Sequence, residues 1–460
     1  MMTAKQERRE LLGSERISKL IPMMAVPTIV SQLITTIYNL VDTFFVSKLG
    51  TNATAAVGVN NSMERFIMMF ATLIGAGACS YIARLLGQNK DDQANRVMST
   101  SIISGLTIGL VVAVLGKIFL SPLTDLLGAT ADCKQYAMEY GTYVLYAAPF
   151  MIGSLILNMV LRSEGSSRFA MIGMGFGGIL NCFLDPLFIF TFDLGVSGAS
   201  IATAISKIIS FLILLWPYIR KKTFVSLSVK YFKLVYEDIK EVIEIGMASF
   251  MRSVFNVIAL VYLNRVAGSF STSALAAISV ATRIMQFPFA AILGFGQGFQ
   301  PVVGYNWGAK YYKRVKDSYH FTVTVGIIGS IILSVIIITF AHPLIALFNS
   351  QADLEIFRYG CLAMRAEAIM LPLHILGTIC NMFYAGIGKG KQALLISTAR
   401  QGYCFLPLLF ILPRFFDVTG LCITQSAADL LSGIITIPLH ISANKLIATK
   451  LPEDQKIQSM

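Results

Sequence analysis

The stretch TNATAAVGV at residues 51–59 returns as TSALAAISV at residues 272–280, an offset of 221 residues. The correspondence continues without a gap and pairs Phe66 with Phe287, Gly75 with Gly296, Gly77 with Gly298 and Gly87 with Gly308. A second pair, NMVLRSEGSSRFA at 158–170 and NMFYAGIGKGKQA at 381–393, matches at an offset of 223. Two matches in the same order indicate a chain built from two related halves.

The composition around these repeats is that of a membrane protein. The 460 residues are 55% hydrophobic and only 13% charged, whereas ordinary globular chains have roughly 25% charged residues. The apolar residues form long runs, many near the ~20 residues that a helix needs to cross a bilayer. These runs are too long for barrel strands, and helices satisfy their own backbone hydrogen bonds in lipid. We therefore expect an all-α membrane protein.

Apolar windows predict twelve membrane-spanning helices. Their expected ranges are 22–46, 54–80, 97–120, 137–161, 170–192, 196–218, 241–264, 274–303, 320–345, 360–384, 392–413 and 418–442. The repeats place spans 2 and 8, and spans 4 and 10, in the same orientation. The sequence thus predicts two pseudo-symmetric six-helix bundles, at 1–220 and 241–460, joined by a basic cytoplasmic linker at 221–240. Parallel repeats of this kind are a transporter architecture, in which one half rocks against the other.

Loop charges predict the orientation. Of the 37 Lys and Arg residues, 25 fall in the two tails and in the loops after spans 2, 4, 6, 8 and 10. No loop on the other side carries more than two. Because Lys and Arg accumulate in cytoplasmic loops, we expect both termini in the cytosol.

The same distribution explains the net charge of +12 without a nucleic-acid partner. The seven cysteines form no C-x-x-C pair, the four histidines have no ligand spacing, and no nucleophile motif is recognisable. We therefore expect neither an enzyme nor a resident cofactor.

Among the charged residues within or at the edges of the expected spans, where charges are costly and usually functional or paired, ten are candidates for a role. They are Asp42, Glu64, Arg65, Asp185, Lys207, Arg252, Arg283, Arg365, Glu367 and Arg400. Arg252 is open to two interpretations, because it could bind an anionic group of a substrate or pair with an acid of a neighbouring helix.

Four polar residues of the first half share one depth. Asp42, Asp185 and Thr203 each lie five to seven residues from the external end of their spans, which is roughly 10 Å at 1.5 Å per residue. Asn181 precedes Asp185 by four residues, so the two share a helical face. Carboxylate, amide and hydroxyl oxygens suit a hard cation such as Na⁺, and the carboxylates also suit a proton. The competing interpretation is that Lys207 neutralises Asp185.

Proline within the spans indicates where helices can bend. Pro27 in span 1 is the natural hinge for a moving helix. A static kink filled by a neighbouring side chain is the alternative.

Several of these stretches resemble the multidrug and toxic compound extrusion (MATE) transporters. They are YNLVD at 38–42, NCFLDPLFIF at 181–190, GASIAT at 198–203 and the paired LRSEG and GKGKQALL segments, with ARQGYCFLPLLFILPRF at 399–415 resembling the MepA/DinF-like bacterial branch. The resemblance covers essentially the whole chain. It implies a secondary antiporter of the bacterial plasma membrane that exports cationic, amphipathic drugs in exchange for H⁺ or Na⁺.

The resemblance also implies roles for individual residues. The ion-coupling site of the family falls on Asp42, Asn181, Asp185 and Thr203, with Tyr140, Tyr38, Asn39 and Lys207 as a supporting network. Arg252, Asn256 and Met285 are expected to line the substrate cavity. Some relatives have a cation site in the second half, but Asn256 and Leu376 occupy its acidic positions here, so we expect none. We expect organic cations and the lipid bilayer as the only partners, and a monomer.

One alternative function stays open at this stage. A flippase for lipid-linked precursors, from the same superfamily, would use a basic cavity, which Arg65, Arg252 and Arg283 could supply. Twelve rather than fourteen spans and the acidic site in the first half argue against it.

Overall fold

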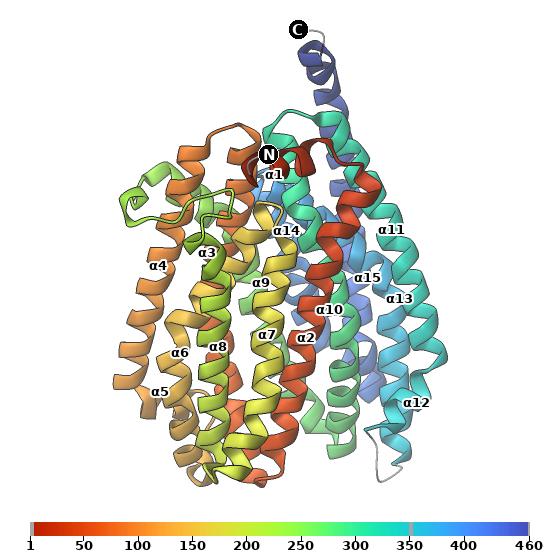
Figure 1. Ribbon diagram of the computed structural model, residues 1–460. Coiled ribbons are helices and arrows are strands. Elements are labelled where there is room, and N and C mark those ends of the chain that lie inside the picture. The colour runs from red at the N-terminus through yellow and green to blue at the C-terminus, as the bar shows by residue number, and fades with distance from the viewer. Residues whose placement is uncertain (1–3, 349–352, 459–460) are drawn as a thin grey trace.

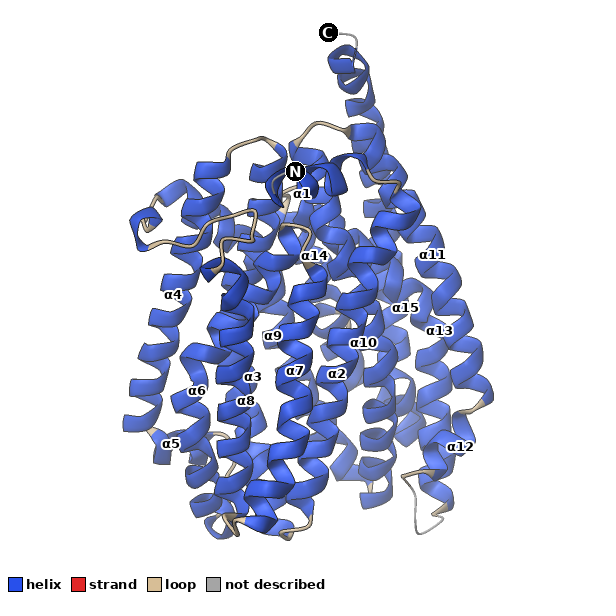
Figure 2. Ribbon diagram, viewed as in Figure 1, coloured by secondary structure: helices blue, strands red, loops and turns tan. Residues whose placement is uncertain are grey.

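The computed structural model describes residues 4–348 and 353–458, and within these ranges the chain is helical without a strand (Figure 2). Among the described residues, eleven helical segments are long and apolar enough to cross a membrane. They are α2 (Ile17–Ser47), α3 (Thr51–Gly87), α4 (Asp91–Ile118), α6 (Ala131–Ser163), α7 (Ser167–Pro186) with the π-turn Leu187–Thr191, α8 (Gly195–Ile219), α9 (Tyr236–Phe270), α10 (Thr272–Gly308), α11 (Tyr312–Thr339), α13 (Leu354–Gly386), and the run from α14 (Gly390–Thr398) through the π-turn Ala399–Tyr403 into α15 (Phe405–Gln458). The all-α prediction is confirmed.

The last of these segments contains two crossings. Asp417 has φ 50° and ψ −137°, which interrupts α15. Gly420 allows the close approach that follows, because a Cβ there would overlap the carbonyl oxygen of Leu412. The chain therefore reverses at Asp417, between the two spans expected at 392–413 and 418–442, and the number of crossings becomes twelve.

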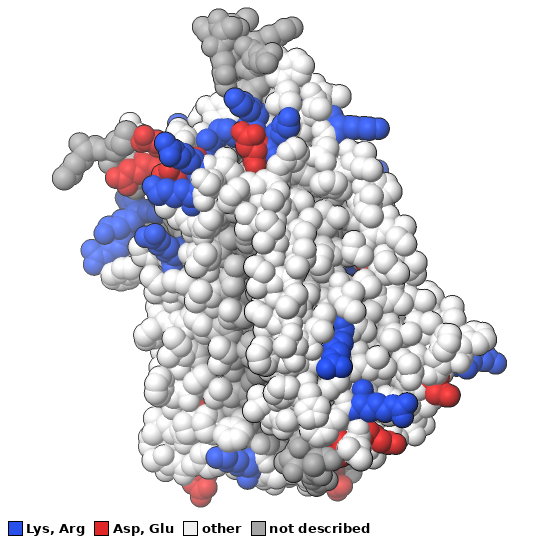
Figure 3. All heavy atoms as spheres, turned by 90° about the vertical axis from the view of Figure 1, so that its right-hand side faces the viewer, with Lys and Arg blue, Asp and Glu red and all other residues white. Residues whose placement is uncertain are grey.

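The helices stand side by side in one elongated bundle, and both termini lie at the same end (Figure 1). We call this the terminal end. Short helices cap the bundle: α1 (Ala4–Ser14) at the terminal end, and α5 (Leu120–Leu126) and α12 (Ala341–Ala346) toward the opposite end. On the face drawn in Figure 3, most charged side chains gather toward the two ends and leave a largely uncharged band between them. A bilayer would cover such a band.

The predicted repeat is visible in hydrogen bonds and backbone angles. Asn158 Nδ2 donates to the carbonyl oxygen of Ala170 at 2.9 Å, and Asn381 Nδ2 donates to that of Ala393 at 2.6 Å. Between them, Gly165 and Gly388 both have φ 84°, a conformation that glycine adopts without steric cost. The asparagines therefore brace equivalent turns in the two halves.

At the terminal end the two halves pack through repeat-related glycines. A Cβ on Gly87 of α3 would overlap the carbonyl oxygen of Tyr305 on α10, and a Cβ on Gly308 of α10 would overlap that of Arg84 on α3. The two contacts are reciprocal, because the glycine of each helix lies against the backbone of the other helix. We call this contact the glycine seam, and it closes the space between the halves at the terminal end.

Helix α2 joins the second half in the same way. Gly294 and Gly298 of α10 lie against the backbone of α2 at Ile29 and Ala25. Pro27 lies between these contacts, is buried, and belongs to one uninterrupted helix. Its backbone neighbours are therefore held by α10, and its predicted role as a hinge stays a prediction.

Helix α1 bridges the two halves across the terminal end. Arg9 Nη2 contacts both carboxylate oxygens of Asp91 in the first half, at 2.9 and 3.0 Å. In the second half, Asn306 Nδ2 donates to the carbonyl oxygen of Leu12 at 3.1 Å, and Arg314 Nη2 donates to that of Glu15 at 2.9 Å. Leu12 is fully buried. Helix α1 and Glu15 therefore form a strap, residues 4–15, anchored in both halves.

The linker is also docked, and it ends at Val235, five residues before the predicted boundary, because α9 begins at Tyr236. The backbone N–H groups of Phe224 and Val225 donate to Glu164 Oε2 at 2.6 and 3.0 Å. Arg8 of the strap lies 3.5 Å from Glu164 Oε1. Glu164 follows the last residue of α6, is fully buried, and burial raises its pKa to about 7 despite Arg8 and the two N–H donors.

Candidate ion site and central cavity

Three helices of the first half bring the predicted polar residues together. Asn181 and Asp185 lie one turn apart on α7, Thr203 faces them from α8, and Asp42 comes from α2. We call these four residues the acidic site. All four are buried, with at most 7% of each residue exposed. The structure thus brings together Asn181 and Asp185, which share a helical face, and Thr203, which was expected at the same depth.

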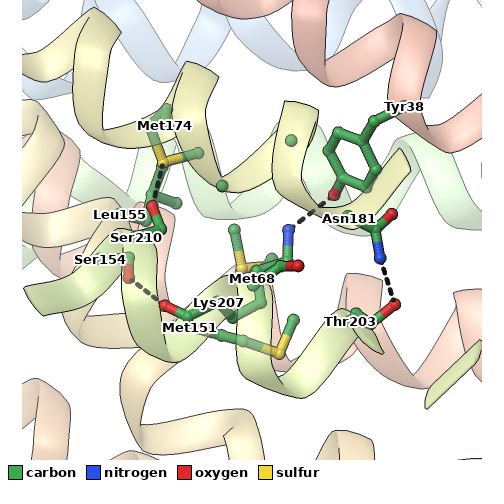
Figure 4. Close-up of a pocket in the computed structure, with 13 residues that line it drawn as sticks. Tyr38, Met68, Met151, Ser154, Leu155, Met174, Asn181, Thr203, Lys207 and Ser210 are labelled. Atoms are coloured by element: carbon green, nitrogen blue, oxygen red, sulfur yellow. Dashed lines mark hydrogen bonds between the residues drawn. The ribbon is translucent and has the colours of Figure 1, made fainter. Parts of the chain in front are cut away.

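The acidic site is only partly satisfied by its own hydrogen bonds. Asn181 Nδ2 donates to Asp185 Oδ1 at 3.0 Å. It also donates to Thr203 Oγ1 at 3.3 Å (Figure 4). Three buried oxygens, Asp42 Oδ1, Asn181 Oδ1 and Asp185 Oδ2, accept no hydrogen bond from the described residues. Burying such oxygens costs free energy unless a donor or cation satisfies them. The chemistry of this donor set fits a proton or a hard monovalent cation.

Lys207 lies nearby but is engaged elsewhere. Its Nζ donates to the Tyr38 hydroxyl at 2.6 Å and stands 4.6 Å from the centre of that ring (Figure 4). Within the described chain, no carboxylate lies within 4.0 Å of this ammonium group. Asp42 and Glu64 act on Lys207 electrostatically, whereas the charge that acts on Asp185 is Asp42. Lys207 therefore makes no ion pair with Asp185.

Tyr140 and Asn39, the other expected members of the supporting network, lie in two different places. Tyr140 of α6 is buried and interacts with Thr203, so it lies beside the acidic site. Asn39 instead lines the large cavity described below. The reason is helical geometry: Tyr38 and Asp42 are one turn apart, whereas Asn39 is rotated about 100° from Tyr38.

A small internal void adjoins the acidic site. Its volume is about 20 Å³, and its lining includes Tyr38, Asn181, Thr203 and Lys207. Figure 4 shows Lys207 and Tyr38 reaching toward each other across it, with Asn181 and Thr203 at one side. A void of this size holds about one water molecule, so a small ion without its hydration shell or a relayed proton fits and an organic molecule does not.

A much larger cavity lies between the two halves. Its volume is about 610 Å³, within the range of sites for drug-sized molecules. Polar residues of α2, methionines, two phenylalanines and five charged side chains line it; the charged ones are Arg65, Arg162, Arg252, Glu367 and Arg400. We call it the central cavity.

Two of the three residues predicted to line the substrate cavity do so. Arg252 and Asn256 lie one turn apart on α9 and both line the central cavity. Met285 does not line it, because its side chain is fully buried in the apolar core, and the following residue, Gln286, takes that place. Of the three arginines that favour a basic cavity, Arg65 and Arg252 line it and Arg283 does not.

Several polar contacts of the cavity wall were not predicted. Arg400 forms a two-point ion pair with Asp429 of α15, with Nε–Oδ1 2.6 Å and Nη2–Oδ2 3.3 Å. Arg162 Nη1 donates to Gln297 Oε1 at 2.5 Å and thereby links α6 to α10. An acid at position 429 in an apolar span is a detectable signal, but its partner depends on how α15 is rotated against its neighbours.

A known family matches both halves of the chain. The MatE family model matches residues 27–187 and again residues 248–411. The chain belongs to the MatE family of membrane transporters. The double match agrees with the internal repeat and with the equivalent turns at Gly165 and Gly388.

Individual relatives extend over nearly the whole MatE chain. Multidrug export protein MepA of Staphylococcus saprophyticus is 28% identical over 398 residues, 86% of this chain and 87% of its own. MepA of Staphylococcus aureus is 27% identical over 442 residues, 95% of this chain and 97% of its own. A solved outward-facing structure of a multidrug resistance MATE family transporter superimposes with a TM-score of 0.90 at 25% identity, covering 96% of this chain and 98% of that one.

Proposed function

We propose that this MatE protein exports amphipathic organic compounds, toxic drugs among them, in exchange for H⁺ or Na⁺ that enters through the acidic site. The observation that carries the proposal is the set of three buried oxygens on Asp42, Asn181 and Asp185 that accept no hydrogen bond within the described chain. An ion or proton would satisfy them, and the adjoining void admits nothing larger.

The two sites are suited to coupling because they share helix α2. Asp42 belongs to the acidic site, and Gln32, Thr36 and Asn39 of the same helix line the central cavity. An ion at Asp42 would therefore change the helix that forms one wall of the substrate cavity. Ion and substrate then favour different arrangements of the halves, which is the thermodynamic requirement for exchange. Rocking of the halves would open the glycine seam.

A transport assay tests the proposal. Everted membrane vesicles are loaded with a fluorescent drug under a pH gradient alone and under a sodium gradient alone. We expect one gradient to drive transport, and Asp185→Asn and Asp42→Asn to reduce it at least tenfold, on the order of the loss of one charged interaction. Asp193→Asn is the matched control, because Asp193 is an exposed acid in the turn after α7. Undiminished ion-driven transport in both site variants would refute the assignment.

The flippase alternative draws on the arginines of the central cavity. Its volume of about 610 Å³ suits a drug-sized molecule rather than a lipid-linked oligosaccharide. If the vesicles move no organic dye under either gradient and the purified protein binds a lipid pyrophosphate, the flippase replaces the exporter.

A further inference from the structure

The linker between the halves is buried over its first part only. Residues 223–225 are buried, but from Val229 to Tyr236 every residue except Val235 is exposed. The exposed fraction is 80% at Val229, 63% at Leu234 and 73% at Tyr236. Large apolar side chains exposed in one short run mark a contact with a partner or with a membrane.

The backbone of this exposed segment is nevertheless fixed to α4. The backbone N–H of Ser228 donates to Ser99 Oγ at 3.2 Å, and Thr100 Oγ1 donates to the carbonyl oxygen of Lys233 at 3.1 Å. The segment therefore runs beside α4 at the outer edge of the bundle, near the terminal end (Figure 1). Its side chains are presented to the surroundings from a bonded backbone.

The position of the contact along α4 gives the depth of the segment. Ser99 and Thr100 lie eight and nine residues after Asp91, the first residue of α4, which is roughly 13 Å along the helix. Beyond them α4 exposes large apolar side chains from Leu110 to Ile118, as a helix does where it faces hydrocarbon. The segment thus lies between the polar start of α4 and its apolar outer face, at the level of lipid headgroups.

The charge around this segment is strongly positive. Between residues 216 and 236 the sequence has five basic residues and no acid, and all five basic residues are exposed: Arg220, Lys221, Lys222, Lys230 and Lys233. The next residue, Glu237, is an exposed acid, which leaves a local excess of four positive charges (5 − 1). Trp216, which is 53% exposed, precedes them, and the Arg220 guanidinium lies 4.7 Å from the centre of its ring. Tryptophan concentrates where a bilayer meets water.

Basic and apolar side chains together at this depth match an anionic phospholipid. Four to eight Lys and Arg residues directly beside a membrane helix attract negatively charged headgroups. Apolar side chains beside them enter the boundary between headgroups and acyl chains. An acidic soluble partner would satisfy the charges, but the place of the segment beside the apolar outer face of α4 favours a lipid.

We infer that residues 229–236 form a lipid anchor, which binds anionic phospholipid in the leaflet at the terminal end. Lys230 and Lys233 hold the headgroup phosphate, while Val229, Leu234 and Tyr236 reach the acyl chains. Because the anchor is bonded to α4 and continues directly into α9, the lipid fixes both helices relative to the membrane. This inference does not depend on the proposed export function.

Lipid binding to the purified full-length protein tests the anchor. The protein in neutral detergent is titrated with dioleoylphosphatidylglycerol or dioleoylphosphatidylcholine, and native mass spectrometry counts the bound lipids. We expect phosphatidylglycerol to bind at least about thirtyfold more tightly, since each lysine near an anionic surface contributes about fivefold. Equal binding of the two lipids by the wild type would overturn the inference.

Variants assign the preference to the anchor. Lys230→Gln with Lys233→Gln should weaken phosphatidylglycerol about thirtyfold and leave phosphatidylcholine unchanged, and Lys230→Arg with Lys233→Arg should retain the preference. The matched control is Lys316→Gln with Lys445→Gln, which removes two exposed lysines on α11 and α15. An equal loss in the control pair, or binding of glycerol phosphate as tight as that of the intact lipid, would show that residues 229–236 are not a lipid anchor.

A second measurement asks whether the apolar side chains reach the acyl chains. Tyr236→Trp is introduced into a protein whose two tryptophans are replaced by phenylalanine, and the protein is placed in phosphatidylglycerol vesicles with brominated acyl chains. We expect the bromines to reduce its fluorescence about twofold, as for a side chain at the headgroup boundary. Thr449→Trp, at an exposed position on the part of α15 that projects beyond the bundle, should stay unquenched. An unquenched Tyr236→Trp would place the segment in water and refute the anchor.

Discussion

At the scale of single residues, buried acids at the two ends of the molecule differ in what surrounds them. The acidic site leaves oxygens of Asp42 and Asp185 without donors. Glu164 at the terminal end instead meets two backbone N–H groups, Arg8 and the Tyr218 hydroxyl. A fully surrounded acid serves structure, whereas an incompletely satisfied one is available to an ion.

Glu164 makes stability depend on pH. Burial raises its pKa from 4.5 to about 7, so the folded protein keeps a proton that the unfolded chain releases. The stabilisation is fully present below about pH 4.5, is lost as the pH rises through 7, and amounts to roughly 3 kcal/mol at most. We expect the wild-type melting temperature to fall by a few degrees between pH 5.5 and 8, and Glu164→Gln to flatten this part of the profile.

Thermal unfolding in detergent at several pH values measures the effect. Glu10→Gln, which alters an exposed acid of α1, should follow the wild type. A Glu164→Gln profile parallel to the wild type would show that the carboxyl stays ionised across this range.

The contact between Lys207 and Tyr38 yields a second prediction. Because Lys207 donates to Tyr38 and forms no ion pair with Asp185, removing the hydroxyl leaves the carboxylates of the acidic site in place. Tyr38→Phe should lower stability by about 1.5–3 kcal/mol, the contribution of a hydrogen bond to a charged group. It should keep ion-driven transport within about threefold of the wild type, as expected of a group outside the ion-binding set. If Tyr38→Phe loses transport as completely as Asp185→Asn in the vesicle assay, Lys207 takes part in the ion cycle.

The acidic site shows what a sequence can predict at this scale. Depth and helical periodicity brought Asn181, Asp185 and Thr203 together correctly, because both depend only on position along a helix. The partner of Lys207 was not predictable, because it depends on how α8 is rotated against α2. The same limit applies to Met285, whose neighbour Gln286 faces the cavity instead.

At the scale of elements, the glycine seam joins α3 and α10. A methyl group on Gly87 would overlap the Tyr305 carbonyl oxygen, and overpacking of this kind costs about 1–3 kcal/mol. Gly87→Ala should therefore lower the melting temperature and loosen the seam. Gly58→Ala on the same helix is the control, because no atom lies within 4 Å of a Cβ there, and it should leave stability unchanged or slightly raised.

The melting temperatures of the two purified variants, measured by thermal unfolding under one condition, test this prediction. Equal melting temperatures for Gly87→Ala and Gly58→Ala would mean that the glycine seam accommodates a methyl group without losing stability.

The helices are longer than the apolar windows predicted. Span 2 was expected at 54–80, whereas α3 covers Thr51–Gly87. Hydropathy detects the part of a helix that lies in lipid and misses polar turns that continue beyond it. The last two spans were expected separately at 392–413 and 418–442, and the reversal at Asp417 lies between them. Apolar windows therefore located the gap between these spans, but not the positive φ of Asp417 that reverses the chain within it.

At the scale of the whole molecule, the repeat was predictable but the conformation was not. Equivalent glycines and asparagines recur at fixed offsets, so the two related halves follow from the sequence. The end at which the halves close is a property of one state among several that the same sequence can populate. Here the seam and the strap at residues 4–15 close the terminal end.

The strap should therefore bias the halves toward this closed arrangement. Arg314→Ala removes a donor that ties Leu12 and Glu15 to α11, and we expect the terminal end to open more often. The readout is a single cysteine at Ser253, which lines the central cavity, in a protein whose seven native cysteines are replaced. Labelling by a membrane-impermeant maleimide from the terminal side should rise about threefold, the shift expected from losing a bond worth roughly 0.7 kcal/mol. Lys316→Ala, an exposed change two residues along α11, should not alter it. Unchanged labelling in folded Arg314→Ala protein would show that the seam alone holds the terminal end closed.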